Sequence, residues 1–380
     1  MSSYQICKRC VMDTTATEIS FDSDGVCSFC HYFDNHFKPI LERAYSGQGR
    51  RALEQIIADI KRHRKGKPYD SVLGLSGGAD SSYLAYLAVE LGLRPLIIHV
   101  DTGWNSPESI CNVKELVKSL GLDLEIIVVD WEEMRDLQIA FYRASVKNCE
   151  IPQDHAFLAA LYHKTAELGL HYILIGGNLA SESILPRSWG FNAADLRHLL
   201  AINRRFGKRP LQKFPTLSLA RRYLYYPFIR KINTIRPLNY LSYNRDEAKR
   251  ILSEKFGWQD YGLKHYESVL TRFYQGYYLP TKFGIDKRKA HLSSLILSGQ
   301  ITREQALKEL EKPPYPSEEQ LQKDKAFIAE KLGLTLSEWE EILGLPARDH
   351  LEFPSSEFLF RTKDRLVGLI RRKRLRYGLQ

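Results

Sequence analysis

The sequence of 380 residues has no apolar run of the roughly 18 residues that a membrane-spanning helix needs, so we expect no membrane span. It opens Met-Ser-Ser-Tyr-Gln without an apolar signal core, so we expect a cytoplasmic protein rather than a secreted one. Internal repeats and low-complexity tracts are absent as well. Hydrophobic residues make up 44% of the chain and aromatic residues 11%, which excludes disorder as the global state.

Acidic residues are in deficit, with 45 Asp and Glu against 55 Lys and Arg and a net charge of +10. The deficit is greatest over residues 196–245, which hold twelve Lys and Arg and no Asp or Glu, with tyrosines and phenylalanines between them. A second basic run, 371–376, lies near the end of the sequence. Such segments are typical either of a solvated helical surface or of a face for a phosphate-rich ligand, and both interpretations stay open.

The six cysteines come without an export signal, which favours metal-binding or catalytic thiols over disulfides. Four of them form two C-x2-C pairs sixteen residues apart: Cys7, Cys10, Cys27 and Cys30. Two such pairs bring four thiolates to one tetrahedral ion, which predicts a structural Zn²⁺ that serves folding and docking rather than catalysis. An unmetallated reduced hairpin, a redox pair and an iron–sulfur cluster are the alternatives.

Short apolar strands alternate with helical patterns from residue 69 onwards. The strands are expected at 71–75, 95–100, 124–129 and 172–175. This alternation predicts an α/β fold, a doubly wound parallel sheet with helices on both faces. Ligands of such sheets bind beyond the carboxyl ends of the strands, which selects the loops 76–82, 101–107 and 176–183.

The predicted organisation of the whole chain has five parts, about twice the count that length alone suggests. They are a zinc-binding ribbon (1–38), a linker helix (39–68), the α/β domain (69–190), a helical substrate-binding domain (191–312) and a helical, basic C-terminal tail (313–380).

The loop after the first strand carries the chemistry, with the sequence Ser-Gly-Gly-Ala-Asp-Ser-Ser. Gly77 and Gly78 allow a tight turn with N–H groups pointing inward, and the helix that follows adds a positive N-terminus. Ser76, Ser81 and Ser82 supply hydroxyl donors. Asp80 would repel a bare phosphate, so its expected partner is Mg²⁺. The loop is neither a Walker A motif, whose lysine it lacks, nor a Rossmann G-x-G-x-x-G motif.

This loop resembles the PP-loop of the ATP pyrophosphatase superfamily. The resemblance implies an enzyme that splits ATP between the α and β phosphates, adenylates a carbonyl oxygen and lets a nucleophile displace AMP. The implied pyrophosphate-binding residues are Ser76, Gly77, Gly78, Asp80, Ser81 and Ser82. The main chain at His99 and Val100 would face the adenine, Asp101 matches an acidic position of the family, and Gly176, Gly177 and Asn178 would close over the nucleotide.

A narrower resemblance links nearly the whole chain to the N-acetyl sugar amidotransferases of surface-polysaccharide and sialic-acid-like sugar synthesis. It rests on the PP-loop, the four N-terminal cysteines and the stretches 261–268 and 285–293. It implies that ATP adenylates an N-acetyl group, as in lipopolysaccharide or O-antigen precursors. Ammonia then converts it to an acetamidino group. The implied cofactors are ATP, Mg²⁺ and structural Zn²⁺, and the implied substrate is a nucleotide-activated N-acetyl sugar.

Charged residues near these stretches are candidates for the chemical steps. Lys287 and Arg288, beside Lys282, could clamp the developing pyrophosphate charge. The remaining candidates are carboxylates that would stabilise a cationic amidine and histidines that would take a proton from ammonium: Glu182, Glu267, His265 and His291. For each of them, a surface charge or a satisfied core histidine is the alternative.

The source of ammonia is expected to be a separate glutaminase, similar to the subunits of imidazole glycerol phosphate synthase. Neither an N-terminal cysteine nucleophile nor a glycine-rich cysteine turn is present in this sequence. The main rival function is tRNA thiolation, with Cys149 or Cys111 as sulfur carrier, although we expect nucleic acid not to be the partner. A non-enzymatic nucleotide-binding scaffold is the third class.

Overall fold

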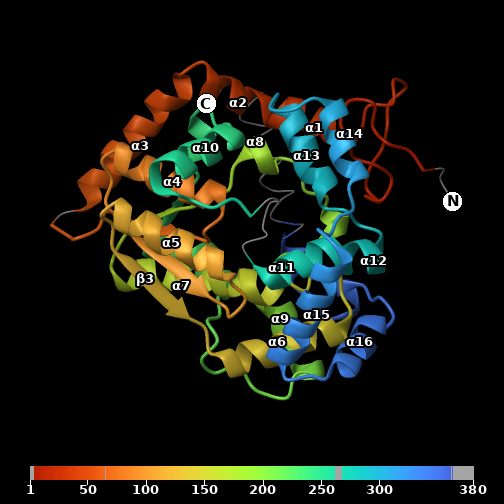
Figure 1. Ribbon diagram of the computed structural model, residues 1–380. Helices are drawn as coiled ribbons and strands as arrows, with labels where there is room; N and C mark the ends of the chain where they lie inside the picture. The colour runs from red at the N-terminus through yellow and green to blue at the C-terminus, as the bar shows by residue number, and fades with distance from the viewer. Residues whose placement is uncertain (1–3, 65, 262–267, 361, 363–380) are drawn as a thin grey trace.

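A five-stranded parallel sheet organises the computed structural model, which describes residues 4–64, 66–261, 268–360 and 362 (Figure 1). The strand order is β3-β2-β1-β4-β5. The strands are β1 (Ser71–Gly74), β2 (Pro95–Asp101), β3 (Leu124–Val128), β4 (Tyr172–Leu174) and β5 (Asn233–Ile235). The predicted α/β fold and its first four strands are confirmed, with ends within one residue of expectation.

The strand order reverses at β1, which pairs in parallel with β2 on one side and with β4 on the other. The chain moves outward from β1 through β2 to β3, then returns to β4 on the opposite side. The loops that follow β1 and β4 therefore leave the sheet side by side and in different directions. A crevice at this point is where ligands of open α/β sheets bind.

Alternate residues of each strand face opposite layers of helices, as the pleat of a strand requires. Leu73 of β1 is buried in one layer and Val72 in the other. The first layer contains α3 (Gln48–Arg64), α4 (Ala79–Glu90), α5 (Pro107–Ser119) and α10 (Arg245–Phe256). The second contains α6 (Trp131–Ala144) and α7 (Ile151–Glu167). Both faces of the sheet are covered at β1, β2 and β4, whose residues are nearly all buried.

The fifth strand comes from the acid-free segment and extends the sheet beyond the expected boundary at residue 190. β5 pairs with β4 through Tyr172–Asn233 and Ile173–Thr234. Its outer position leaves Asn233 and Thr234 exposed. The residues around it contribute α9 (Leu196–Phe206) and α10, and α10 packs on α4 beside the PP-loop.

The N-terminal cysteine module docks onto helices from the far end of the sequence. The last cysteine, Cys30, lies in α1 (Ser28–His36), and two further helices, α2 (Lys38–Tyr45) and α3, follow in place of one linker helix. Gly47, with φ +78°, turns the chain between α2 and α3. Figure 1 shows α1 beside α13 (Arg288–Leu297) and α14 (Arg303–Glu311).

The C-terminal helices pack against the rest of the molecule. α15 (Glu318–Leu332) lies against α11 (Val269–Phe273), where Arg272 donates two hydrogen bonds to Asp324 at 2.7 and 2.8 Å. α16 (Leu336–Gly344) buries Trp339 against Tyr142 of α6. The short helix α12 (Leu279–Phe283) completes this region. Within the described part of the chain, no helix combines the length and the apolar character that crossing a bilayer requires.

Candidate functional site

A cavity opens at the carboxyl ends of β1, β2 and β4, the position expected for the ligand. One end is polar and is lined by the loop after β1 and by the chain after β4: Ser76, Gly78, Asp80, Ser81, Gly176, Gly177 and Glu182. The other end is apolar and is lined by β2 and α7: Ile98, Val100, Phe157 and Leu161. A pocket with these two ends suits a ligand with a flat base and a phosphate chain.

The PP-loop is held in shape by its own hydroxyl groups. The Ser76 and Ser81 hydroxyls lie 3.1 Å apart, and the Ser76 oxygen accepts a hydrogen bond from the Gly78 amide at 3.3 Å. Ser82 is fully buried and donates to the Gly77 carbonyl at 3.3 Å, so it shapes the loop and does not line the cavity. Gly77 has φ +92°, and a Cβ there would lie 2.7 Å from the Ser109 hydroxyl.

Two aromatic donors from beyond the sheet occupy the Gly77 carbonyl. The Trp258 indole N–H and the Tyr261 hydroxyl each donate to this oxygen, at 3.0 Å. Asn112 of α5 orients Tyr261 with a hydrogen bond to its hydroxyl at 2.5 Å. These donors neutralise a backbone acceptor at the loop, which leaves the local field favourable to an anion.

Asp80 is fixed by two side chains that come from distant parts of the sequence. The buried Tyr243 hydroxyl donates a hydrogen bond to Asp80 Oδ1, and the Ser181 hydroxyl donates to Oδ2 at 3.4 Å. Burial, and then the charge of Asp80, hold the pKa of the Tyr243 phenol well above its usual value. The phenol therefore keeps its proton and remains a donor, so Asp80 is presented to the cavity as an oriented carboxylate, a ligand suited to Mg²⁺.

Gly176 brings the chain after β4 into direct contact with the start of α4. A Cβ on Gly176 would lie 2.7 Å from the Ser81 amide nitrogen and 2.8 Å from the Asp80 carbonyl carbon. These are backbone atoms at the first turn of a helix and cannot move aside locally. Only glycine permits this approach, so the chain after β4 packs directly against the PP-loop at Gly176.

The end of β2 contributes an apolar wall and a hydrogen-bonded loop. The His99 ring bonds the Leu75 carbonyl through Nδ1 at 2.8 Å, and its Nε2 lies 3.0 Å from the Asn105 amide. Because a carbonyl only accepts, Nδ1 carries the proton and Nε2 accepts. Asp101 accepts from the Gly103 amide at 2.8 Å and from Asn105 at 3.3 Å. His99 and Asp101 thus hold this loop, while Val100 lines the cavity.

Asn178, Glu182 and His291 meet next to Asp80. Asn178 caps α8 (Leu179–Glu182) by accepting the Ser181 amide hydrogen bond at 2.9 Å. Glu182 of this helix lines the cavity. His291 of α13 contacts the Ser181 carbonyl through Nδ1 at 3.4 Å. The structure therefore connects these predicted residues, from two separate stretches of sequence, to the short helix whose Ser181 hydroxyl bonds Asp80.

The predicted phosphate clamp is not at the cavity. Arg288 pairs with Asp286 at 2.7 Å and donates to the Lys312 carbonyl at 2.9 Å. Lys282 donates to the Leu343 carbonyl at 2.7 Å, and the Lys287 ammonium lies 5.5 Å from the centre of the Tyr274 ring. These positions give Arg288 and Lys282 structural roles and do not support a clamp. The candidates His265 and Glu267 lie outside the described residues.

Several residues that line the cavity were not predicted from the sequence. Among the described residues, Arg245 at the start of α10 is the one Lys or Arg that lines the cavity, and Asp260, which pairs with Lys249 at 2.8 Å, lines it as well. Tyr243 lies two residues before Arg245. No motif marks these positions, but the spacing of Phe157 and Leu161, four residues apart on a predicted helix, was a usable signal for the apolar wall.

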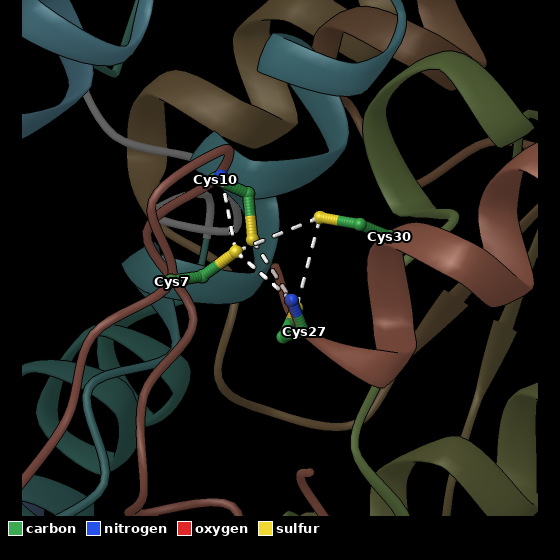
Figure 2. Close-up of side chains that lie close together, drawn as sticks. All are labelled: Cys7, Cys10, Cys27 and Cys30. Atoms are coloured by element: carbon green, nitrogen blue, oxygen red, sulfur yellow. Dashed lines mark hydrogen bonds between the residues drawn. The ribbon is translucent and has the colours of Figure 1, made fainter. Parts of the chain in front are cut away.

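The four N-terminal cysteines form a compact cluster (Figure 2). Their sulfur atoms all lie within 4.8 Å of one another, with separations of 3.6 Å for Cys27–Cys30, 3.7 Å for Cys10–Cys27 and 3.8 Å for Cys7–Cys30. Four sulfurs at about 2.3 Å from one tetrahedral Zn²⁺ lie about 3.8 Å apart, so these residues fit a single zinc ion. An iron–sulfur cluster, whose thiolates bind different irons, requires wider spacing.

Helix α13 connects the cysteine cluster to the PP-loop cavity. Arg303 donates hydrogen bonds to the Cys7 and Cys10 carbonyls at 2.9 and 3.0 Å. On α13, Ser293 accepts from the Val11 amide at 3.2 Å, and the adjacent Ser294 accepts from the amide of Ile184, just after α8, at 2.9 Å. Helix α13 is thus hydrogen-bonded to the N-terminal cysteine module through Ser293 and to the chain just after α8 through Ser294.

Two family models match separate parts of the chain. Residues 70–160 match the phosphoadenosine phosphosulfate reductase domain. Residues 267–366 match the C-terminal domain of proteins that resemble the LPS biosynthesis protein WbpG. The chain therefore carries a PP-loop domain, of a class whose members use ATP, together with a WbpG-like C-terminal domain.

Similar proteins cover the chain to different extents. An uncharacterized protein of Methanocaldococcus jannaschii is 24% identical over 321 residues, which are 82% of this chain and 95% of that protein. A glutamine-hydrolyzing GMP synthase of Chlamydia caviae is 39% identical over 100 residues, which are 26% of this chain and 19% of that enzyme. The tRNA thiolase NcsA of Methanococcus maripaludis, solved with its iron–sulfur cluster, is 14% identical with a TM-score of 0.32, covering 83% of this chain and 91% of that one.

Replacing Gly176 by alanine is expected to impair ligand binding at the cavity. The new methyl group must displace the backbone of Asp80 and Ser81, which we expect to cost about 1–3 kcal/mol of stability and to weaken ATP binding. Gly344→Ala is the matched control, because a Cβ there meets no atom within 4 Å. Calorimetric titration with ATP and thermal unfolding measure both effects, and equal ATP affinity in the two variants would contradict the assigned contact.

The cysteine cluster is expected to hold about one zinc ion per chain. Cys27→Ser should lose the metal, lower the unfolding temperature and increase amide exchange in α13, which bonds the module. Cys111→Ser, which alters an exposed cysteine outside the cluster, should change none of these. Elemental analysis and hydrogen-exchange mass spectrometry make the comparison, and iron in place of zinc, or unchanged exchange in α13, would overturn this account.

Proposed function

We propose that this chain, with its PP-loop and WbpG-like domains, is an ATP-dependent amidotransferase that converts an N-acetyl group of a sugar to an acetamidino group. The observation that carries the proposal is that Asp80 and Glu182 line the polar end of a cavity whose other end is apolar, while His291 contacts the carbonyl of Ser181, whose hydroxyl bonds Asp80. The WbpG-like match supports a role in modifying sugars of lipopolysaccharide synthesis.

ATP binding accounts for both ends of the cavity. The adenine would lie against Ile98, Val100 and Phe157, and the pyrophosphate would bind the PP-loop amides and the N-terminus of α4. Mg²⁺ held by Asp80 would supply charge neutralisation to the phosphates. Arg245 takes the place of the cationic clamp that was expected at Lys287 and Arg288, because its side chain lines the cavity.

The proposed chemistry has two displacement steps. The acetamido oxygen attacks the α-phosphorus of ATP, the bond to the β-phosphate bridge breaks, and pyrophosphate leaves. Ammonia then adds to the carbon of the resulting imidate, and AMP leaves with the original amide oxygen. Glu182 is placed to stabilise the cationic amidine. His291, which contacts the Ser181 carbonyl, would accept the proton that ammonium releases.

The partners follow from this chemistry and are part of the proposal. The substrate would be a nucleotide-linked N-acetyl sugar, whose phosphates could bind basic residues of the acid-free segment 196–245. A separate glutaminase would supply ammonia.

The rival function, tRNA thiolation, gains no support from Cys149. This thiol is fully buried and contacts the Val146 carbonyl at 3.3 Å. Burial raises the pKa of the Cys149 thiol to about 12, so almost none of it is the thiolate that carries sulfur. Such a cysteine is expected to act as a small core residue.

The direct test of the proposed reaction combines ATP, Mg²⁺, ammonium and candidate nucleotide-linked N-acetyl sugars. Mass spectrometry should detect a product in which NH replaces one oxygen, with AMP and pyrophosphate in equal amounts. Asp80→Ala should abolish both products. The control Asp246→Ala removes an exposed carboxylate of α10 and should have little effect. Full turnover by Asp80→Ala would contradict the assignment of the PP-loop.

Replacing Cys149 by serine separates the two candidate functions. Amidation should persist at near the wild-type rate once a folded variant is obtained, because no step uses the thiol. Complete loss of activity in a variant whose thermal unfolding is unchanged would favour the thiolation rival.

A further inference from the structure

An apolar patch lies on the surface of the π-helix Arg221–Ile229, away from the cysteine cluster and the PP-loop. Its large side chains are exposed to an unusual degree: Leu224 by 62%, Phe228 by 73% and Ile229 by 69%, with Tyr225 at 40%. Large exposed apolar groups that gather on one face mark an interaction surface, whereas scattered ones do not.

Basic residues border this patch at both ends of the helix. Arg221 and Arg222 begin it, and Arg230 and Lys231 follow it directly. They belong to the segment 196–245, which contains no Asp or Glu to neutralise them. The combination of an apolar face with a rim of Arg and Lys is typical of a segment that lies in the interface of an anionic bilayer.

A second apolar segment adjoins the same helix. The Tyr223 ring contacts Phe360 at a centroid distance of 6.3 Å, and the neighbouring Phe358 and Leu359 are exposed by 77% and 58%. The sequence that follows, 363–380, holds seven Lys and Arg and one Asp, with four apolar residues between 366 and 370. The composition of this sequence, together with the exposed Phe358 and Leu359, favours an extended anionic surface over a single small pocket.

Other occupants fit the patch less well. A second copy of the chain would bring two basic rims together, which repel each other. Nucleic acid would match the charge, and its bases could stack on Tyr225 and Phe228, but the exposed aliphatic side chains of Leu224 and Ile229 would gain no apolar partner from it. An anionic bilayer satisfies both the charge and the aliphatic side chains.

We propose that helix Arg221–Ile229, with Phe358 and Leu359 beside it, attaches the protein peripherally to an anionic membrane surface. The attachment is reversible, since these side chains reach only the headgroup and upper acyl region. It is compatible with the proposed function but does not depend on it, because the patch lies outside the cavity.

Flotation of the full chain with lipid vesicles tests this proposal. Vesicles of phosphatidylcholine with phosphatidylglycerol should bind the chain at least about tenfold more tightly than phosphatidylcholine alone, and added salt should weaken the binding. The double variant Phe228→Glu with Ile229→Glu should bind the anionic vesicles at least about tenfold more weakly than the wild type. The double variant Arg221→Gln with Arg222→Gln should also bind them more weakly.

The matched control is Val128→Glu with Leu351→Glu, which places two charges at sites exposed by 71% and 56% elsewhere on the surface. It should bind vesicles like the wild type. Thermal unfolding should be nearly unchanged in all these variants, because the replaced side chains are exposed, except that of Arg222, which is half-buried. Absence of vesicle binding, equal binding by the Phe228/Ile229 variant, or loss of a dimer in that variant without vesicle binding would each overturn the proposal.

Discussion

The contact between Gly176 and the first turn of α4 is the constraint on which the candidate site depends. It places the chain after β4 against the backbone of Asp80 and Ser81, at the point where the strand order reverses. Because this approach is so close, α8 begins within reach of Asp80, and the Ser181 hydroxyl can bond the carboxylate. A side chain at Gly176 would separate the two halves of the cavity.

Regions far from the PP-loop complete this arrangement. Tyr243, between β5 and α10, orients Asp80 from one side, and α13 brings His291 to α8 from the other. The cysteine cluster is bonded to α13 and α14 through Val11 and through Arg303. A metal in the N-terminal module would therefore stabilise the site indirectly, through α13 and α14. This coupling explains how a closed site of four cysteines can matter to an enzyme without taking part in the chemistry.

The sequence predicted the core of the fold well because the relevant signals are local. The first four strands are apolar runs followed by loops, and the PP-loop is a continuous motif. β5 was missed because it is three residues long and two of them, Asn233 and Thr234, are exposed and polar. Its pairing with β4 is a tertiary contact that no local pattern encodes.

The residues of the PP-loop could be identified from a continuous motif. The cations of the site could not, because the position of a charged side chain depends on the groups that it pairs with in the folded chain. Arg288 lies in a conspicuous basic run, but its guanidinium pairs with Asp286, two residues before it. The same guanidinium donates a hydrogen bond to the Lys312 carbonyl, just after α14. Arg245 belongs to an ordinary helix start but faces the cavity. A charge in the sequence shows nothing of the carboxylate or carbonyl that meets it, so distant cations are the least predictable part of such a site.

The most direct measurement of the central claim follows the amide oxygen of the substrate. A nucleotide-linked sugar labelled with oxygen-18 in its N-acetyl carbonyl is incubated with the chain, ATP, Mg²⁺ and ammonium, and the AMP is analysed by mass spectrometry. The account predicts that the label appears in AMP, because the oxygen leaves with the adenylate. Amidine formation with unlabelled AMP, or formation of ADP in place of AMP, would contradict it.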